Sequence, residues 1–212
     1  MKINVKNNLP DDVEVHMTQT FDGSVTIILS EAKLSETKSR ILGDAKPGEV
    51  VKIGDWEWVV LEQRSEGTAV ITKDFIETME FGNNFDWRTS LIREKLNKEF
   101  IKELTTVIGE RSIIETERDL TSLDGLDDYG TCMDKISLLT ATEYAKYHKI
   151  LGLKSSYPDW CFLITPYSAP SNGYSRGVCC VRPNGAVSWR DCDCALGIRP
   201  FCILNSSIPL SD

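Results

Sequence analysis

The chain has 212 residues, with 24 Lys and Arg against 32 Asp and Glu, and therefore a formal net charge of −8. Hydrophobic residues make up 41% and charged residues 26%, as in ordinary globular proteins, which excludes a disordered chain, a collagen and a coiled-coil rod. The negative charge argues against a protein that binds nucleic acid through bulk electrostatics.

Two β-rich runs lie near the N-terminus, Val13 to Met17 and Ser24 to Leu29, and Phe21-Asp22-Gly23 between them has the chemistry of a turn. The pattern predicts a β-hairpin. Because an isolated hairpin is only marginally stable in water, we expect it to pack on the main body or on another chain. A homo-oligomer formed through the hairpin is therefore one expected assembly.

A domain boundary is predicted near residue 40. The polar stretch 35–40 is followed by Gly43 and by Pro47-Gly48, which interrupt any regular pattern. We therefore divide the chain into an N-terminal β-hairpin extension, residues 1–40, and a ligand-binding domain, residues 41–212.

The domain begins with three short predicted strands, Val50 to Ile53, Trp56 to Glu62 and Thr68 to Ile71. Gly54-Asp55 and Ser65-Glu66-Gly67 between them are turn sequences, so the pattern predicts an antiparallel meander.

Two helices follow. The first is predicted to begin at the N-cap Asp86 and to end before Gly109, because its apolar residues recur at helical spacing: Leu91, Ile92, Leu96, Phe100, Ile101 and Leu104. The second is predicted to begin with the capping box Thr140 to Glu143 and to run through Tyr147.

An acidic segment with Asp119, Asp124, Asp127 and Asp128 lies between the two helices. Its carboxylate spacing differs from that of an EF-hand loop, so a solvated loop is favoured over a calcium site.

Residues 155–212, here called the tail, differ in composition from the rest of the chain. The tail contains no Lys, Glu, Gln or Met, although residues 1–154 contain 14 Lys and 16 Glu, and it holds six of the seven Cys. Short apolar pieces alternate with Pro, Gly, Ser and Asn, which is typical of strands joined by long irregular loops. With the preceding elements, this predicts an α+β fold.

The cysteines allow four interpretations. Disulfides would need an oxidising compartment, and the sequence shows no export signal. Cys179-Cys180 and Cys192-Asp193-Cys194 offer four thiolates to zinc, but structural zinc sites usually separate paired ligands by two residues. A catalytic thiol needs a base, and both histidines, His16 and His148, lie outside the tail. Free thiols are favoured, and we expect no enzyme activity, no metal and no cofactor.

Aromatic side chains in the tail stand among Ser, Asn, Asp and Arg, the composition of antibody-like binding surfaces. Lys and Glu are depleted at protein interfaces, which agrees with their absence from the tail. We expect Trp160 and Trp189 to anchor the loops as core residues and Tyr167 and Tyr174 to be exposed.

The order of motifs from Gly48 onward resembles a family of bacterial and phage domains of unknown function. The matching segments are Gly48 to Leu61, Trp87 to Asn97, Asp134 to Thr140 with Glu143-Tyr144, Leu163 to Pro166, and Gly197 to Pro200. The chain departs from the family at Ile164, where the family has Arg. The resemblance implies a C-type-lectin-like α+β fold with two helices, short antiparallel strands and long C-terminal loops, related in shape to formylglycine-generating enzymes.

Several such domains resemble the variable proteins of diversity-generating retroelements, in which mutated Asn codons never become Lys, Glu, Gln, Met or Trp. By this resemblance, that rule would explain the absence of Lys, Glu, Gln and Met from the tail and its unusual number of Cys. The resemblance also implies which tail residues form the scaffold: Trp160, Gly185, Gly197, Arg199 and Pro200. It implies a diversified ligand-binding site of Tyr167, Ser168, Ser171, Asn172, Tyr174, Arg176, Ser188, Arg190, Asp191 and Asp193.

The leading functional prediction is a ligand-binding, receptor-recognition module of a phage or bacterium, with a protein or glycan ligand and no nucleic-acid partner. The alternatives are a thiol- or metal-dependent enzyme related to formylglycine-generating folds and a structural protein of a virion or cell surface. No run of 18 apolar residues occurs, and Met1 to Asp12 lacks the apolar segment of a signal peptide. We therefore expect no membrane span and a cytoplasmic or virion-associated location.

Overall fold

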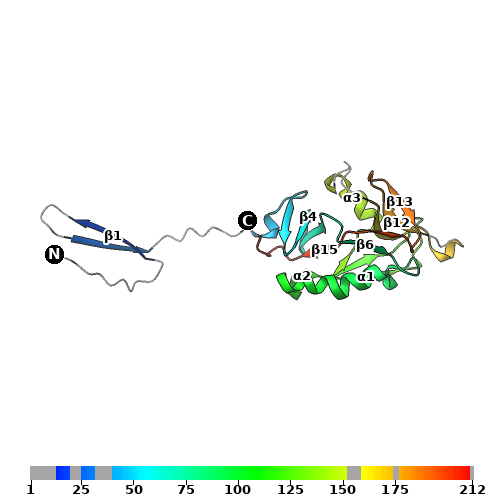
Figure 1. The fold of residues 1–212 in the computed structure, drawn as a ribbon, viewed down its shortest axis with the longest axis horizontal. Coiled ribbons are helices and arrows are strands. Elements are labelled where there is room, and N and C mark those ends of the chain that lie inside the picture. The colour runs from blue at the N-terminus through cyan, green and yellow to red at the C-terminus, as the bar shows by residue number, and fades with distance from the viewer. Residues whose placement is uncertain (1–12, 20–24, 32–39, 152–158, 174–176, 211–212) are drawn as a thin grey trace. The chain divides into compact units, whose positions relative to one another are not determined.

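The computed structural model describes residues 13–19, 25–31, 40–151, 159–173 and 177–210. The chain divides into two compact units, residues 1–39 and 40–212. In the first unit, strands β1 (Val13–Gln19) and β2 (Val25–Glu31) form an antiparallel hairpin (Figure 1).

The described part of the second unit is mainly β, with thirteen strands in three sheets and two helices. The expected α+β class with a C-type-lectin-like fold is therefore wrong. The sequence missed strands β6 (Glu77–Glu80), β8 (Thr116–Asp119) and β9 (Thr131–Asp134), the last two of which pair in a separate ribbon. These strands are largely polar and partly exposed, so they lack the apolar alternation that marks a strand in sequence.

The first sheet contains the predicted meander. β3 (Val50–Ile53), β4 (Trp56–Gln63) and β5 (Thr68–Thr72) are antiparallel neighbours, which confirms that prediction. The sheet continues from β5 to β15 (Phe201–Leu204), which also pairs with two short strands, β7 (Ile113–Ile114) and β10 (Ile136–Ser137).

The second sheet is built mostly from the tail. Its order is β13 (Val187–Arg190), β12 (Val178–Val181), β11 (Cys161–Pro166), β14 (Ala195–Ile198) and β6. Only the β11–β14 pair of this sheet is parallel among the described strands. The tail therefore contributes more regular strand than the expected long loops.

The first predicted helix is a continuous rod of α1 (Leu91–Lys95), the π-helical turn η3 (Leu96–Phe100) and α2 (Ile101–Ile108). Its N-cap is Ser90, whose Oγ accepts from the Arg93 backbone N–H at 3.0 Å. Asp86, the predicted cap, instead caps a preceding 3₁₀ turn through the Arg88 N–H.

The second helix, α3 (Ala141–Leu151), begins with the predicted capping box. The Thr140 hydroxyl accepts from the Glu143 N–H at 3.0 Å, and the Glu143 carboxylate accepts from the Thr140 N–H at 2.9 Å. The helix ends at Leu151, one turn beyond the predicted Tyr147. Among the described residues, no helix combines the length and apolar character needed to cross a bilayer.

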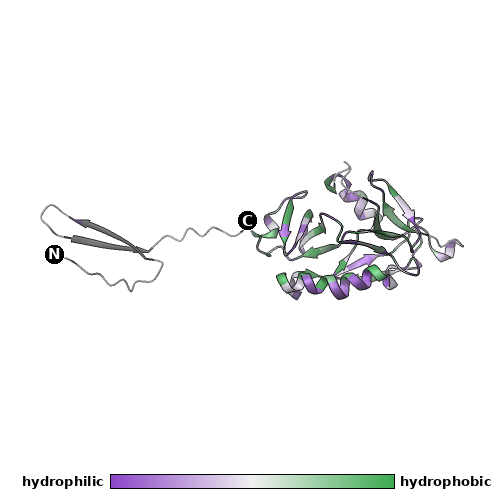
Figure 2. Cartoon of the chain, in the orientation of Figure 1, coloured by the Kyte–Doolittle hydropathy of each residue, from purple (hydrophilic) through white to green (hydrophobic). Residues whose placement is uncertain are grey.

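The central strands of the two sheets, β5 and β15 in the first and β11 and β12 in the second, are buried on both faces, with one apolar cluster on each face. In β15, Cys202 and Leu204 belong to the cluster beneath the α1–α2 helix, whereas Phe201 and Ile203 belong to the cluster beneath α3. Figure 1 shows α1 and α2 along one side of the strands and α3 on the other, and in Figure 2 the long helix carries hydrophilic residues along its outer side. This double burial explains why the central strands appear in the sequence as short continuous apolar runs.

Candidate functional site

At the outermost hairpin of the second sheet, β12–β13, two arginine side chains pack against one indole ring. The Arg190 guanidinium carbon lies 3.6 Å from the ring centroid of Trp160, which precedes β11, and the Arg182 guanidinium carbon lies 5.0 Å from the same ring. Arg182 also donates to the Ser188 hydroxyl at 3.1 Å. Ser188 and Arg190, both predicted site residues, therefore lie on one face of the hairpin with Trp160, since alternate residues of a strand share a face.

The opposite face of the hairpin carries an aromatic pair. The rings of Tyr167 and Trp189 lie 5.5 Å apart between centroids. Trp189 packs directly over Gly177, where a Cβ atom would lie 2.7 Å from the indole and where φ is +83°. Gly177 is therefore required by both the backbone and the close approach of the ring.

The exposure of these aromatic residues differs from the sequence prediction. Trp160 and Trp189 are half-buried instead of lying fully in the core, and Tyr167 is half-buried instead of exposed. One face of each ring is covered by another tail side chain, because the hairpin carries partners for them on both faces.

Three other predicted site residues are held by the acidic segment. The Ser168 hydroxyl and the Asn172 amide donate to the Asp124 carboxylate at 2.6 and 2.9 Å. Ser171 donates to the Asp128 carboxylate through both its N–H and its hydroxyl, at 2.8 and 2.7 Å. These carboxylates join residues 168–172 to a segment more than forty residues earlier in the chain.

The acidic segment is therefore not the simple solvated loop expected from the sequence. Its Asp124 and Asp128, here called the clamp, hold residues 168–172, the clamped loop, through hydrogen bonds. Hydrogen bonds from the Ser122 and Ser168 hydroxyls lower the pKa of Asp124, so its carboxylate is ionised and accepts donors from both segments. Among the described residues, no group of three or more His, Cys, Asp or Glu side chains is arranged to hold a metal ion.

A depression of about 340 Å³ lies where the clamp meets the tail. Its lining residues are Leu123, Asp124, Tyr167, Ser168 and Asn172. Leu123 is 50% exposed, and its backbone N–H donates to the Pro166 carbonyl at 2.8 Å. The sequence analysis did not predict Leu123 as a site residue. The only local sign of its role is that an apolar residue stands next to aspartates in the acidic segment.

The structure places the predicted site residues in separate groups. Ser188 and Arg190 lie on one face of β13, Tyr167 lies beside Trp189 on the other face, and Ser168, Ser171 and Asn172 lie in the clamped loop. Asp191 is half-buried and Asp193 is exposed in the connection from β13 to β14. Tyr174 and Arg176 lie outside the described residues. Arg182, which the sequence analysis did not select, belongs with Arg190.

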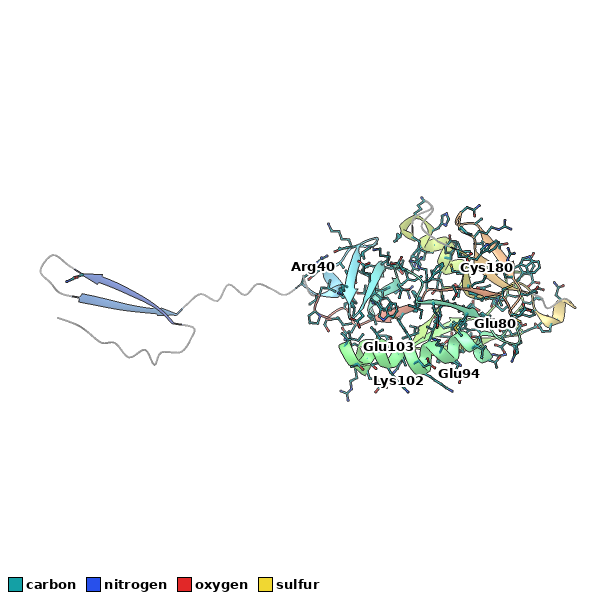
Figure 3. The ribbon with its side chains drawn as sticks, viewed as in Figure 1. Arg40, Glu80, Glu94, Lys102, Glu103 and Cys180 are labelled. Atoms are coloured by element: carbon teal, nitrogen blue, oxygen red, sulfur yellow. The ribbon has the colours of Figure 1, made fainter. Side chains whose placement is uncertain are left out.

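The cysteines do not form a four-thiolate zinc site, because no three metal-ligating side chains come together among the described residues. All seven are free thiols. Cys179 and Cys180 are consecutive in β12, so they point into different apolar clusters, and burial raises the pKa of each to about 12 (Figure 3 shows Cys180 among the strands). Thiols with such pKa values are poor nucleophiles at neutral pH.

Several residues that the family resemblance assigns to the scaffold have structural contacts. A Cβ atom at Gly197 would lie 2.3 Å from the Phe75 ring, and buried Arg199 donates to the Thr72 carbonyl at 2.9 Å. The Gly185 carbonyl accepts from the Tyr144 hydroxyl at 2.8 Å.

Comparison with known protein families places most of the chain in a family that is defined by sequence and has no assigned function. Residues 66–206, more than half of the chain, match the family described as Domain of unknown function (DUF6273). The chain belongs to this family. The DUF6273 region extends from β5 through β15, so it contains both helices, the clamp and the Trp160 stack, but not β3 or β4. No curated protein sequence and no solved structure shows a significant match to the chain.

Proposed function

We propose that the chain is a ligand-binding module whose recognition surface is formed by the β12–β13 hairpin and the clamped loop. The observation that carries the proposal is the placement of tail aromatic and arginine side chains at the surface. Trp160, Tyr167, Trp189 and Arg190 are only half-buried, although each packs against another of the tail's side chains. Side chains held in this way lose little conformational entropy on binding, which favours recognition.

The composition of the tail supports the same proposal. Trp, Tyr and Arg dominate the residues that contribute most to protein interfaces, and Lys and Glu are depleted there. The tail contains all three of the enriched types and neither of the depleted ones. The scaffold, in contrast, contains all the Lys and Glu of the chain.

We further propose that a diversity-generating retroelement of a phage or bacterium varies the tail. Its support is the resemblance to such variable proteins and the absence of Lys, Glu, Gln and Met from residues 155–212. The neighbouring DNA tests it: we expect a reverse-transcriptase gene and a template repeat that matches the codons for about residues 165–200. Genomic DNA without either would contradict diversification and leave the binding proposal standing.

Ligand affinity tests the binding proposal. Ligands are first selected from a displayed random peptide library and a glycan array on the full chain. The double substitution Tyr167→Ala and Arg190→Ala is then expected to weaken the selected ligand by about tenfold or more, as expected for the loss of an aromatic and a charged contact. Arg111→Ala, at an exposed arginine between α2 and β7, is the matched control and is expected to leave affinity unchanged.

Circular dichroism and thermal unfolding establish that both variants are folded. Unchanged affinity in a folded Tyr167→Ala/Arg190→Ala protein, or the absence of any selected ligand, contradicts the proposed surface.

A further inference from the structure

Two guanidinium groups share the indole of Trp160. Arg182 follows β12 directly and Arg190 ends β13, so the hairpin brings both onto the same ring, with their guanidinium carbons 5.0 and 3.6 Å from its centroid. Cation–π contact fixes the position of each guanidinium and excludes water from the side that faces the ring.

Neither of these guanidinium groups is paired with a carboxylate in the described part of the chain. Arg190 donates to the Trp189 carbonyl at 3.3 Å and Arg182 to the Ser188 hydroxyl at 3.1 Å. Five other arginines form ion pairs with Asp or Glu: Arg40, Arg64, Arg88, Arg93 and Arg118. In a protein of net charge −8, these two neighbouring arginines therefore place two cationic groups, without an ion-pair partner among the described residues, on one indole ring.

Both arginines lie close enough to the Cys180 thiol to affect it electrostatically. Burial raises the pKa of Cys180 to about 12, and the charges of Arg190 and Arg182 oppose that rise. Cys180 pairs with Ser188, which lies between the two arginines in the hairpin. Each guanidinium retains N–H donors in a planar fork, the geometry that binds a carboxylate through two parallel hydrogen bonds.

We propose that Arg182 and Arg190, stacked on Trp160, bind carboxylates of an acidic segment of a partner protein. This inference rests on the ligand-binding function proposed above and names the chemistry of the ligand. A protein partner fits better than a polyanion, because heparin and nucleic acids are bound by clusters of five or more Lys and Arg, whereas the tail has no Lys and its four Arg are balanced by four Asp. Trp and Arg together are typical of the centres of protein interfaces.

The test uses peptides selected from a displayed random library on the full chain, with affinity measured by fluorescence anisotropy. We expect the selected peptides to be enriched in Asp and Glu. The double variant Arg182→Gln/Arg190→Gln is expected to bind them about tenfold to a hundredfold more weakly, as for lost charge-assisted hydrogen bonds. Arg111→Gln, which removes the charge of an exposed arginine elsewhere, is the matched control and is expected to bind normally. Arg182→Lys/Arg190→Lys keeps the charge without the planar fork and is expected to bind with intermediate affinity.

Four outcomes would overturn the inference, and they separate it from the proposed function. Selected peptides without acidic residues, or acidic peptides that bind the folded double Gln variant normally while Tyr167→Ala weakens them, overturn the carboxylate site and leave the binding module. Retention of the full chain on heparin through both arginines, without any acidic peptide, overturns the choice of a protein partner. Peptides insensitive to every tail substitution overturn both the carboxylate site and the proposed function.

Discussion

Glu62 is the side chain on which three donors converge, and it joins the first sheet to α3. Its carboxylate accepts from Lys146 at 2.8 Å, from the Tyr147 hydroxyl at 2.7 Å and from Arg64 at 2.9 Å. The hydrogen bond from Lys146, followed by that from Tyr147, lowers the pKa of Glu62 to about 2 from its ordinary value of 4.5. Charged and polar residues thus attach the helix at its outer edge, beyond the apolar cluster beneath it.

This network makes the stability of the fold depend on pH. Because the pKa of Glu62 is lower in the folded than in the unfolded chain, its contribution is fully present above about pH 4.5 and is lost as the pH falls toward 2. Glu62→Gln is expected to lower the free energy of unfolding by about 1 kcal/mol at pH 7, a modest value because the network is partly exposed to solvent.

Urea denaturation at a series of pH values measures the effect. The difference between the wild type and Glu62→Gln is expected to shrink between pH 4.5 and 2, while Glu103→Gln, on the exposed side of α2, differs little from the wild type throughout. A difference that stays constant down to pH 2 would contradict the assignment.

At the scale of elements, two of the segments that carry the family resemblance, Trp87 to Asn97 and Asp134 to Thr140, meet in one junction. Asp134, at the end of β9, accepts from the Trp87 indole N–H and from Arg93, both at 2.7 Å. Asn97 donates to the Ile136 carbonyl at 2.7 Å and accepts from the Ile136 N–H at 3.2 Å. The long helix is thereby joined to the β9–β10 segment, which gives these motif residues a structural role.

Breaking this junction is expected to destabilise the fold. The Asp134 side chain is 2% exposed, so Asp134→Ala leaves the Trp87 N–H and the Arg93 guanidinium without their acceptor and is expected to cost about 3 kcal/mol of unfolding free energy. Asp127→Ala, at an exposed aspartate of the acidic segment, is the control and is expected to cost far less. Chemical denaturation of both variants tests the comparison, and equal losses would show that Asp134 has no special structural role.

Local signals made part of this structure predictable from the sequence. The helical spacing of Leu91 to Leu104, the capping box at Thr140 and the turns of the meander each depend on residues close in the chain, and the structure confirms them. The cap of the long helix was misplaced because Asp86 and Ser90 are both good N-caps, and only the intervening 3₁₀ turn separates their roles.

The fold class and much of the candidate site depend on contacts between distant segments. β6 and β8 are strands because they pair with β14 and β9, although their own residues are polar. Likewise, Asp124 lies 44 residues before its partner Ser168, and nothing near Asp124 in the sequence indicates that partner. Trp160 and Arg182 meet for the same reason, through the pairing of β11 with β12.

At the scale of the whole molecule, charge and composition separate the scaffold from the tail. The tail has four Arg and four Asp, so the net charge of −8 resides in residues 1–154 and says little about the ligand. Within the DUF6273 region, the long helix and α3 cover the buried faces of the strands, while the β12–β13 hairpin and the clamped loop carry the half-buried aromatic and cationic residues. The same strands therefore provide both the core and the surface proposed for recognition.

Hydrogen–deuterium exchange of the full chain, with and without a peptide selected on it, tests the central claim most directly. We predict that the peptide slows exchange in residues 159–173 and 177–194, which hold the clamped loop and the hairpin, and leaves the exchange of α1 and α2 unchanged. Protection confined to the α1–α2 helix, with unchanged exchange in the hairpin and the loop, would contradict the claim that the tail forms the recognition surface.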